Sequence, residues 1–512
     1  MKGSVTLVVL GAAILLYVKN KLKTQSLASL PPGPKGNWII GNLGVILSKY
    51  QWRTYSAWSK IFGDIIYMKA LGRPVIILNK FEHARELMEK RSSTYSDRPR
   101  MVYIVEMVKI RSVTFMRYGD LWRLHRRLLQ QYLNMRAVVA FQPHQAKAAA
   151  NLLIDLAEEP VNFPDKIKRF SASAVLCSTY GYYVLPKDDP LIALNTHSEG
   201  TIIRPGPPGS TLVDLFPFLQ YLPSFFPGAK FKKMAEQGKD ALYDMATQPY
   251  NMVKEQRKAG KAPYSLLSRM LEEYEQSGAD DEVRYEAIKD VCASMYRAGV
   301  ATTNSTLLVF FMAMVLHPEV VKKAQVELDD YLRGERLPAM EDKDKLPYIT
   351  YIMKECWRWR PPFPLGISHM SMEDDELEGK FIPKGSLIMP NIWHMMHDER
   401  NYTNPEEFDP DRFKDPSILD SRAAIFGFGR RICPGRYFAE ADIWLAMANI
   451  LTVFDIKPAV DDQGADILPD PQAFISGLNS WPLPYQCRIV PRNDKSLPLI
   501  KQNLAIAAEI EL

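Results

Sequence analysis

The chain has 512 residues, of which 47% are hydrophobic and 24% charged, so it can form a sizeable core in one large fold or in two or three ordinary domains. Its net charge is only +5, which excludes the strongly basic surface of a general nucleic-acid-binding protein. The five cysteines are scattered and include no CxxC pair. They therefore argue against a zinc cluster or a disulfide framework and favour a reducing compartment.

The first apolar run is "SVTLVVLGAAILLYV", residues 4–18, and three lysines follow it at 19, 21 and 23. It is shorter than the roughly 20 residues of a full membrane span, and the apolar core of a cleaved signal peptide has a similar length. The lysines, however, separate the run from the candidate cleavage site at residues 26–28. We expect residues 1–23 to be an uncleaved membrane anchor, and the positive charge after the run places the following chain in the cytoplasm.

The next segment, "LPPGPKG" at residues 30–36, contains three prolines and two glycines and cannot continue a helix. We interpret residues 24–36 as a proline-rich linker between the anchor and the globular body, although an ordinary proline-rich loop fits the same letters. Residues 37–512 are then expected to form a single large domain.

Alternating apolar residues in "DIIYMKALGRPVIILN", residues 64–79, predict a β-hairpin. Helical patterns dominate from about residue 122 to residue 317, and residues 295–319 belong to one long apolar helix. Such a helix is buried in a large protein or in lipid. Arg297 and Asn304 interrupt its apolar pattern, so we expect burial in protein.

The run "GKFIPKGSLIMPN", residues 379–391, predicts another small sheet, and residues 493–512 are expected to be a surface tail. No internal repeat or low-complexity tract divides the body. The predicted fold class is mainly α with a small β part.

The stretch "FGFGRRICPGRYFAE", residues 426–440, places a cysteine among glycines and arginines just before a predicted helix. Backbone N–H groups and a helix start favour thiolate over thiol, and a thiolate is a good axial ligand for haem iron. A single cysteine in a glycine-rich turn is more often structural. Here, however, the pattern Phe-x-x-Gly-x-Arg-x-Cys-x-Gly is complete, with Phe426, Gly429, Arg431, Cys433 and Gly435.

This pattern resembles the cysteine motif of the cytochrome P450 family, the haem-thiolate monooxygenases, and other stretches resemble the family in order along the whole body. The resemblance implies the cytochrome P450 fold and haem b, with Cys433 as the iron ligand and Arg431 beside the cofactor. Glu355 and Arg358, three apart on one helix face, resemble the family's Glu-x-x-Arg helix, and Arg412 in "FDPDRF" resembles its third member. We interpret these three residues as structural.

Trp122 and Arg126 fit the family's Trp-x-x-x-Arg helix, which implies that they hold a haem propionate, as an arginine suits a carboxylate. A solvated basic helix face is the alternative. His369 matches a position that often donates to the other propionate, and a hydrogen-bonded core histidine is its alternative.

Residues 298–303, "AGVATT", resemble the family's oxygen-binding groove. The resemblance implies that small residues let the helix pass close over the haem and that Thr302 is catalytic, bonding dioxygen or a proton-delivering water. A helical threonine that bonds its own backbone is the alternative. Ala301 stands where the family usually has an acid, which leaves the proton route open among water chains, Thr303 and Asn304.

The resemblance further implies an NADPH-cytochrome P450 reductase as electron donor, with cytochrome b5 as a second candidate. The basic counterpart for its acidic face would be Arg123, Arg127, Arg430 and Arg436, or these are solvated charges with no partner. Residues 214–228, with several aromatics, resemble the family's loop above the pocket and would touch the membrane or pack inside the protein. These features point to the endoplasmic reticulum membrane, with the catalytic domain in the cytoplasm.

An apolar pocket implies a hydrophobic small-molecule substrate, and the resemblance to fungal microsomal members suggests terpenoid-like secondary metabolites. Two alternatives remain: a haem-thiolate isomerase or dehydratase that needs no reductase, against which Thr302 argues, and a non-enzymatic haem sensor. The expected walls of the substrate pocket are Met101, Phe363, Leu365, Ile367, Ile475, Ser476 and Leu478.

Overall fold

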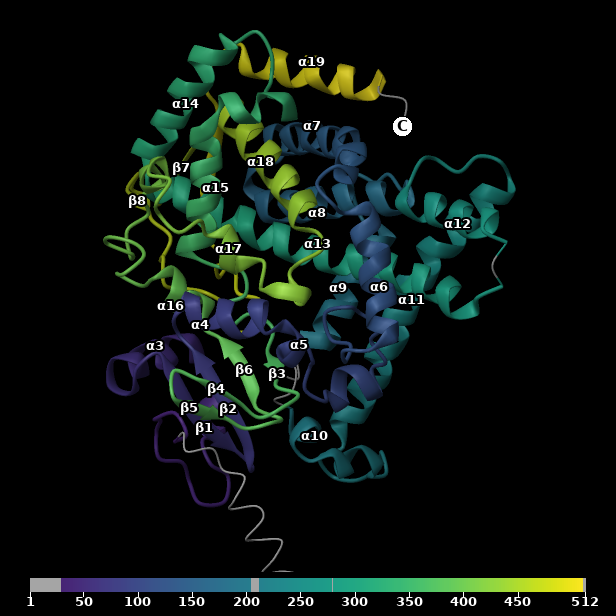
Figure 1. Cartoon of the computed structure of the whole chain (residues 1–512). Coiled ribbons are helices and arrows are strands. Elements are labelled where there is room, and N and C mark those ends of the chain that lie inside the picture. Colours follow the sequence, from purple (N-terminus) through teal and green to yellow (C-terminus); the bar gives the residue numbers. More distant parts are fainter. Residues whose placement is uncertain (1–28, 204–210, 279, 510–512) are drawn as a thin grey trace, which may run out of the picture.

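The computed structural model describes residues 29–203, 211–278 and 280–509 and consists mainly of helices, with three small sheets among the described residues (Figure 1). The predicted anchor at residues 1–23 and residues 24–28 of the predicted linker lie outside the described residues. The mainly α class with a small β part is therefore confirmed for the body of the chain.

The largest sheet is built around the predicted hairpin. Strand β1 (Ile65–Ala70) pairs antiparallel with β2 (Arg73–Leu78), with Ile65 opposite Leu78, so the hairpin at residues 64–79 is confirmed. Strand β6 (Leu387–Pro390) runs parallel to β2, and β3 (His369–Met370) pairs antiparallel with β6. Segments more than 290 residues apart in the chain thus share one sheet.

The small sheet predicted at residues 379–391 is not formed within that segment, because its two strands, β5 (Lys380–Ile382) and β6, belong to different sheets. Strand β5 pairs with β4 (Asp375–Leu377) in a separate ribbon, while β6 joins the four-stranded sheet. Gly385, at φ 80°, turns the chain between the two strands. The separation follows from burial, because the side chains at 388–390 are buried against β2 whereas β5 is mostly half-exposed.

The last sheet contains β7 (Phe454–Val460) between β8 (Asp466–Ile467) and β9 (Cys487–Pro491). Helices supply most of the rest. The longer ones are α3 (Gln51–Phe62), α6 (Asp120–Tyr132), α7 (Gln142–Glu158), α8 (Phe163–Tyr180), α9 (Pro190–Ile203), α11 (Lys230–Lys258), α12 (Leu266–Gln276), α13 (Glu282–Leu316), α14 (Pro318–Leu332), α15 (Pro347–Trp359), α18 (Arg436–Val453) and α19 (Ser496–Glu509). Shorter ones are α2 (Leu43–Ile46), α4 (Phe81–Arg85), α5 (Ser92–Tyr95), α10 (Leu212–Leu215), α16 (Ile392–Met396) and α17 (Arg422–Ile425).

Helix α13 runs through the middle of the molecule (Figure 1). By length and composition it could cross a membrane, but 72% of its most apolar window is buried inside the protein, so the expected burial in protein is confirmed. The helix expected at residues 295–319 ends at Leu316, and Pro318 begins α14. Its neighbour α8 approaches closely at Gly299, where an added Cβ would lie 2.7 Å from Cγ2 of Val175. Gly299 therefore lets α13 and α8 pack closely, and its expected role in letting the helix approach the haem stays a prediction.

Helix α19 replaces the surface tail expected at residues 493–512. It packs on α7 and α18, and Ile500 is only 1% exposed. The Ser496 hydroxyl receives a hydrogen bond from the Asn493 N–H at 3.4 Å as the helix begins. Burying Ile500 against two helices supplies the apolar contact that a free tail would lack.

Candidate functional site

Cys433 lies in a tight loop between a 3-10 turn at Gly429–Arg431 and the start of α18. Its backbone N–H donates to the Phe426 carbonyl at 2.8 Å. Gly429 has φ 54°, and a Cβ there would lie 2.1 Å from the Met88 carbonyl oxygen, so only glycine fits. This close approach is to the protein's own backbone, and the loop is held by packing against residues 86–90.

Cys433 is partly exposed, as are its neighbours at residue 432 and at residues 434–437. Burial raises the pKa of its thiol, while the Gly435 N–H and the guanidinium groups of Arg126 and Arg436 lower it less. The expectation that the loop itself favours thiolate is therefore wrong for the protein alone. A coordinated metal cation deprotonates a thiol outright, so a bound iron would supply the missing driving force.

Helix α13 presents a small, open face in its middle. Ala298 is exposed and Ala301 and Thr302 are partly exposed, whereas most neighbouring residues of the helix are buried. The Thr302 hydroxyl donates to the Ala298 carbonyl at 3.0 Å, which is the self-bonding arrangement considered as the alternative. The hydroxyl must turn away from this carbonyl to serve a ligand.

A chain of contacts links α13 to the cysteine loop. The Trp357 indole N–H donates to the Thr306 hydroxyl at 3.2 Å, and the Trp357 ring meets the Phe426 ring edge-on at 5.3 Å between centroids. Phe426 in turn accepts the Cys433 N–H. These contacts connect the helix that carries Thr302 to the loop that carries Cys433.

Several cationic side chains are buried nearby with carbonyls as partners. Arg431 donates to the carbonyls of residues 96, 113 and 116 at 2.7–2.9 Å, and its guanidinium lies 4.3 Å from the centroid of the Trp122 ring. Arg98 donates to the carbonyls of residues 114, 367 and 368 at 2.6–2.9 Å. Burial and the neighbouring Arg431 lower the pKa of Arg98 well below its usual value.

His369 belongs to the same group. Its Nδ1–H donates to the Tyr95 carbonyl at 2.6 Å, and burial followed by the charges of Arg98 and Arg431 holds its pKa well below the usual value. The nearest carboxylate, Asp97, is already paired with Arg117. Buried like charges without an anion are costly. The donor set therefore fits a ligand with negatively charged groups, as the two propionates of haem are.

Trp122 and Arg126 face the same loop. The Trp122 indole N–H donates to the Val113 carbonyl at 3.1 Å, so it is already committed to the backbone. Arg126 donates to the Ile432 carbonyl, next to Cys433, and burial lowers its pKa. The solvated-face alternative does not describe these two residues, since Trp122 is buried and Arg126 half-buried.

Glu355, Arg358 and Arg412 meet beneath the loop. The Arg358 guanidinium donates to both Glu355 oxygens at 2.7 and 2.8 Å, and Arg412 Nε donates to Glu355 Oε1 at 3.2 Å. Glu355 and Arg358 have no exposed side-chain surface. Arg358 also donates to the carbonyls of residues 396, 405 and 407, so this ion cluster fixes the end of α16 and the loop at residues 405–407 against α15.

The seven expected pocket residues are only partly brought together. Met101 is buried in the main core, and Ile367 and Leu478 pack against that core. Leu365 instead packs against a separate apolar cluster around β1 and β2. The Ser476 hydroxyl accepts the Tyr50 N–H at 2.8 Å. Phe363, Ile475 and Ser476 are partly exposed.

Three residues near the site were missed or passed over by the sequence reasoning. Arg98 was missed, although the charged run "DRPR" at residues 97–100 could have pointed to it. Arg297 was noted only as a break in an apolar helix, yet it is partly exposed near the open face of α13 and has no hydrogen bond or ion pair with a described residue. Asn479 donates to the Ala301 carbonyl at 3.4 Å, and no sequence pattern pointed to it.

Comparison with known proteins places the chain in a family. Residues 31–485 match the family model described as Cytochrome P450. The chain is 38% identical over 508 residues to cytochrome P450 monooxygenase 176 of Postia placenta, which covers 97% of both chains. It is 36% identical over 505 residues to cytochrome P450 monooxygenase claR of Ampulloclitocybe clavipes, covering 97% of this chain and 93% of that one.

A solved zebra fish cytochrome P450 structure with progesterone has a TM-score of 0.71, at 24% identity, and the match covers 86% of this chain and 99% of that chain. That likeness establishes the fold, and the two fungal relatives establish the enzyme class. The chain belongs to the cytochrome P450 family of monooxygenases.

Proposed function

We propose that this monooxygenase holds haem b through Cys433 and oxidises a hydrophobic, terpenoid-like small molecule in fungal secondary metabolism. The observation that carries the proposal is the pairing of a partly exposed Cys433 with the open face of α13 at Ala298, Ala301 and Thr302. The curated relatives are fungal monooxygenases, which agrees with this reading.

The residues present fit the cofactor. Cys433 would bind the iron, and Arg98, Arg126, Arg431 and His369 would face the propionates, with Trp122 packed beneath Arg431. When bound, the haem supplies oxygen activation, which a thiolate ligand promotes. The protein's own part is to exclude water, to orient the substrate and to handle protons at Thr302. Glu355, Arg358 and Arg412 remain proposed as structural.

The proposed substrate is mainly apolar but carries one hydrogen-bond-accepting or acidic group. The proposed walls are Met101, Phe363, Ile367, Ile475 and Leu478, with Leu365 and Ser476 at the margin. Arg297 is an unpaired guanidinium beside Ala298, and its nearest carboxylates, Glu199 and Asp290, raise its pKa less than burial lowers it. An unpaired buried arginine gains most from an acceptor on the ligand.

The proposed electron donor is an NADPH-cytochrome P450 reductase, with cytochrome b5 as the second candidate. Arg123, Arg127 and Arg430 are exposed, Arg436 is partly exposed, and Arg436 donates to the Cys433 carbonyl at 3.1 Å. Arg430 and Arg123 both lie over the Tyr118 ring. A basic patch so close to the cysteine loop suits an acidic partner.

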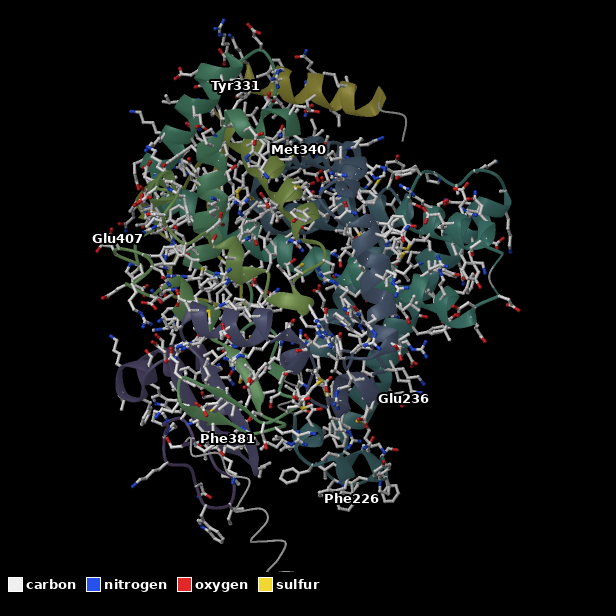
Figure 2. All side chains as sticks on the ribbon, in the orientation of Figure 1. Phe226, Glu236, Tyr331, Met340, Phe381 and Glu407 are labelled. Atoms are coloured by element: carbon white, nitrogen blue, oxygen red, sulfur yellow. The ribbon has the colours of Figure 1, made fainter. Side chains whose placement is uncertain are left out.

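The proposed location is the endoplasmic reticulum membrane, with residues 1–23 as anchor and the catalytic domain in the cytoplasm. The loop at residues 214–228 exposes Phe218, Tyr221 and Phe225, the last at 88%, and Phe226 lies at the tip of the molecule beyond α10 (Figure 2). Clustered exposed aromatics suit a membrane interface. The alternative that they pack inside the protein does not fit these exposures.

The direct test incubates microsomes containing the full chain and a reductase with candidate terpenoids, with and without NADPH. We expect NADPH-dependent products that gain one oxygen atom. Conversion without NADPH would indicate the isomerase or dehydratase alternative. No oxygen or NADPH consumption above background would indicate the sensor alternative.

A further inference from the structure

We propose that Asn479 holds a buried water at the Ala301 carbonyl, and that this water performs the proton handling for which the family usually carries an acid at this position. Asn479 would be a positioning residue that acts through the water. The proposal rests on the proposed monooxygenase function. The water site would take the place of the acid that Ala301 lacks.

The loop that carries Asn479 is hydrogen-bonded to α13 at this residue and at the next one. Asn479 Nδ2 donates to the Ala301 carbonyl at 3.4 Å. The next residue, Ser480, accepts the Ser305 hydroxyl at its carbonyl at 2.7 Å and donates its own N–H to the Pro362 carbonyl at 2.8 Å. The amide is therefore held against the helix turn that runs from Ala301 to Ser305.

Two amide oxygens beside this turn have no hydrogen-bond partner among the described residues. They are Oδ1 of Asn479, whose side chain belongs to a residue only 8% exposed, and Oδ1 of Asn304, one helical turn after Ala301. If the Asn479 amide were turned over, its other end would be the unpartnered one. An unsatisfied buried polar atom costs about 1–3 kcal/mol, and a bound water is the usual remedy.

The structure provides space of the right size on the Ser480 side. A cavity of about 10 Å³ is lined by Ser480, Arg360, Trp393 and Phe474, which is about the volume that one water requires. Arg360 also lines a cavity of about 540 Å³, which opens at the surface next to His317 and Phe408. The two cavities share Arg360 as a lining residue, and the smaller one reaches Ser480, the chain neighbour of Asn479.

A water held by Asn479 would supply the protons that an acid at position 301 would otherwise deliver. Monooxygenation consumes one dioxygen, two electrons and two protons, and it yields one oxidised substrate and one water. The Asn479 amide does not titrate, so it can only orient a water. That water would pass a proton to Thr302 Oγ1 and regain one from solvent. When the proton needed for oxygen transfer is not delivered in time, the oxygen is released as hydrogen peroxide, which carries the two electrons and takes its two protons from solvent.

The test compares the haem-loaded full chain with the Asn479→Leu variant, in which a side chain of similar size has no polar atoms. A crystal structure of the wild type should contain a water within hydrogen-bond distance of Asn479 and of the Ala301 carbonyl, and the variant should lack it. With NADPH, reductase and a substrate from the screen above, we expect peroxide released per NADPH to rise severalfold. Product turnover should fall about tenfold or more at unchanged KM, with a larger D₂O effect on kcat.

Two further variants separate this role from a structural one. Asn449→Leu removes another buried amide, which bonds the carbonyls of residues 338 and 445, and should leave the peroxide fraction unchanged. Ala301→Asp added to Asn479→Leu supplies an acid and should restore coupling. Absence of the water in the wild type, or a peroxide fraction in Asn479→Leu equal to that of the wild type, would overturn the proposal. A wild type that consumes no NADPH would instead contradict the proposed function.

Discussion

The carboxylate of Glu355 has no exposed surface and accepts hydrogen bonds from Arg358, from Arg412 and from the Asp409 N–H at 2.8 Å. Glu355→Gln would leave the fully buried guanidinium of Arg358 without a counter-charge, which typically costs about 3–5 kcal/mol. We expect the free energy of unfolding, measured with urea, to fall by that amount and the yield of haem-loaded protein to fall with it. The exposed Glu406→Gln should change stability by less than about 0.5 kcal/mol, and equal effects of the two changes would contradict the account.

His144 on α7 is 2% exposed, its Nδ1 has no partner among the described residues, and burial lowers its pKa from 6.5 to about 4. Its folded pKa lies below its unfolded value, so the unfolded state binds more protons as pH falls from 6.5 towards 4. Stability contributed by the neutral ring is therefore complete above pH 6.5 and lost below it, by on the order of 2 kcal/mol. Thermal unfolding at pH 7.5 and 5 should show a smaller drop for His144→Gln than for wild type, and identical drops would refute this.

At the residue scale, the sequence could identify site residues that belong to a motif with fixed spacing. Arg431 with Cys433, and Trp122 with Arg126, could each be paired from their short spacing on a loop or a helix. That the two pairs meet across about 306 residues was predicted only from the resemblance to the cytochrome P450 family. Arg98 and Asn479 could not be predicted in this way, because their partners come from segments about 180 to 270 residues away. The direction of the Cys433 pKa shift was wrong for the same reason, since burial is a property of the whole fold.

At the element scale, the closest approach involving α13 is the contact of Gly299 with Val175 on α8. Gly299→Ala gains helix propensity of about 1 kcal/mol, but its Cβ meets a stiff β-branched side chain at 2.7 Å, and overpacking costs about 1–3 kcal/mol. We expect a net loss of stability in urea unfolding. In a Val175→Ala background the clash is gone, so Gly299→Ala should become neutral or stabilising. Simple additivity of the two changes would contradict the proposed contact.

Elements with a clear period were predicted well, and those defined by distant partners were not. The hairpin at β1 and β2 was correct because both strands lie close in the chain and alternate. The pairing of β6 with β2 crosses more than 300 residues, so local pattern could not reveal it. Helix α19 was taken for a tail, and its order follows from packing on α7 and α18, which the local sequence does not show.

At the scale of the whole molecule, one extended apolar core surrounds α13 and includes parts of α6, α7, α8, α15 and α18. The sequence predicted the mainly helical class and the central helix from composition and period. It could not predict which faces of these helices remain open, and the open face at Ala298 and Thr302 became visible only once the other helices were in place. The basic patch near Cys433 and the exposed aromatics beyond α10 lie on different elements, and they carry the surfaces proposed above for the reductase and the membrane.

The central claim is that the Cys433 sulfur binds haem iron, and the carbon-monoxide difference spectrum of the reduced full-length protein tests it most directly. The wild type and a Cys487→Ser control, which changes another of the free cysteines, should both give the thiolate-type band at about 450 nm. Cys433→Ser should lose this band together with NADPH-dependent oxidation. A Cys433→Ser protein that retains the band and its full activity would contradict the account.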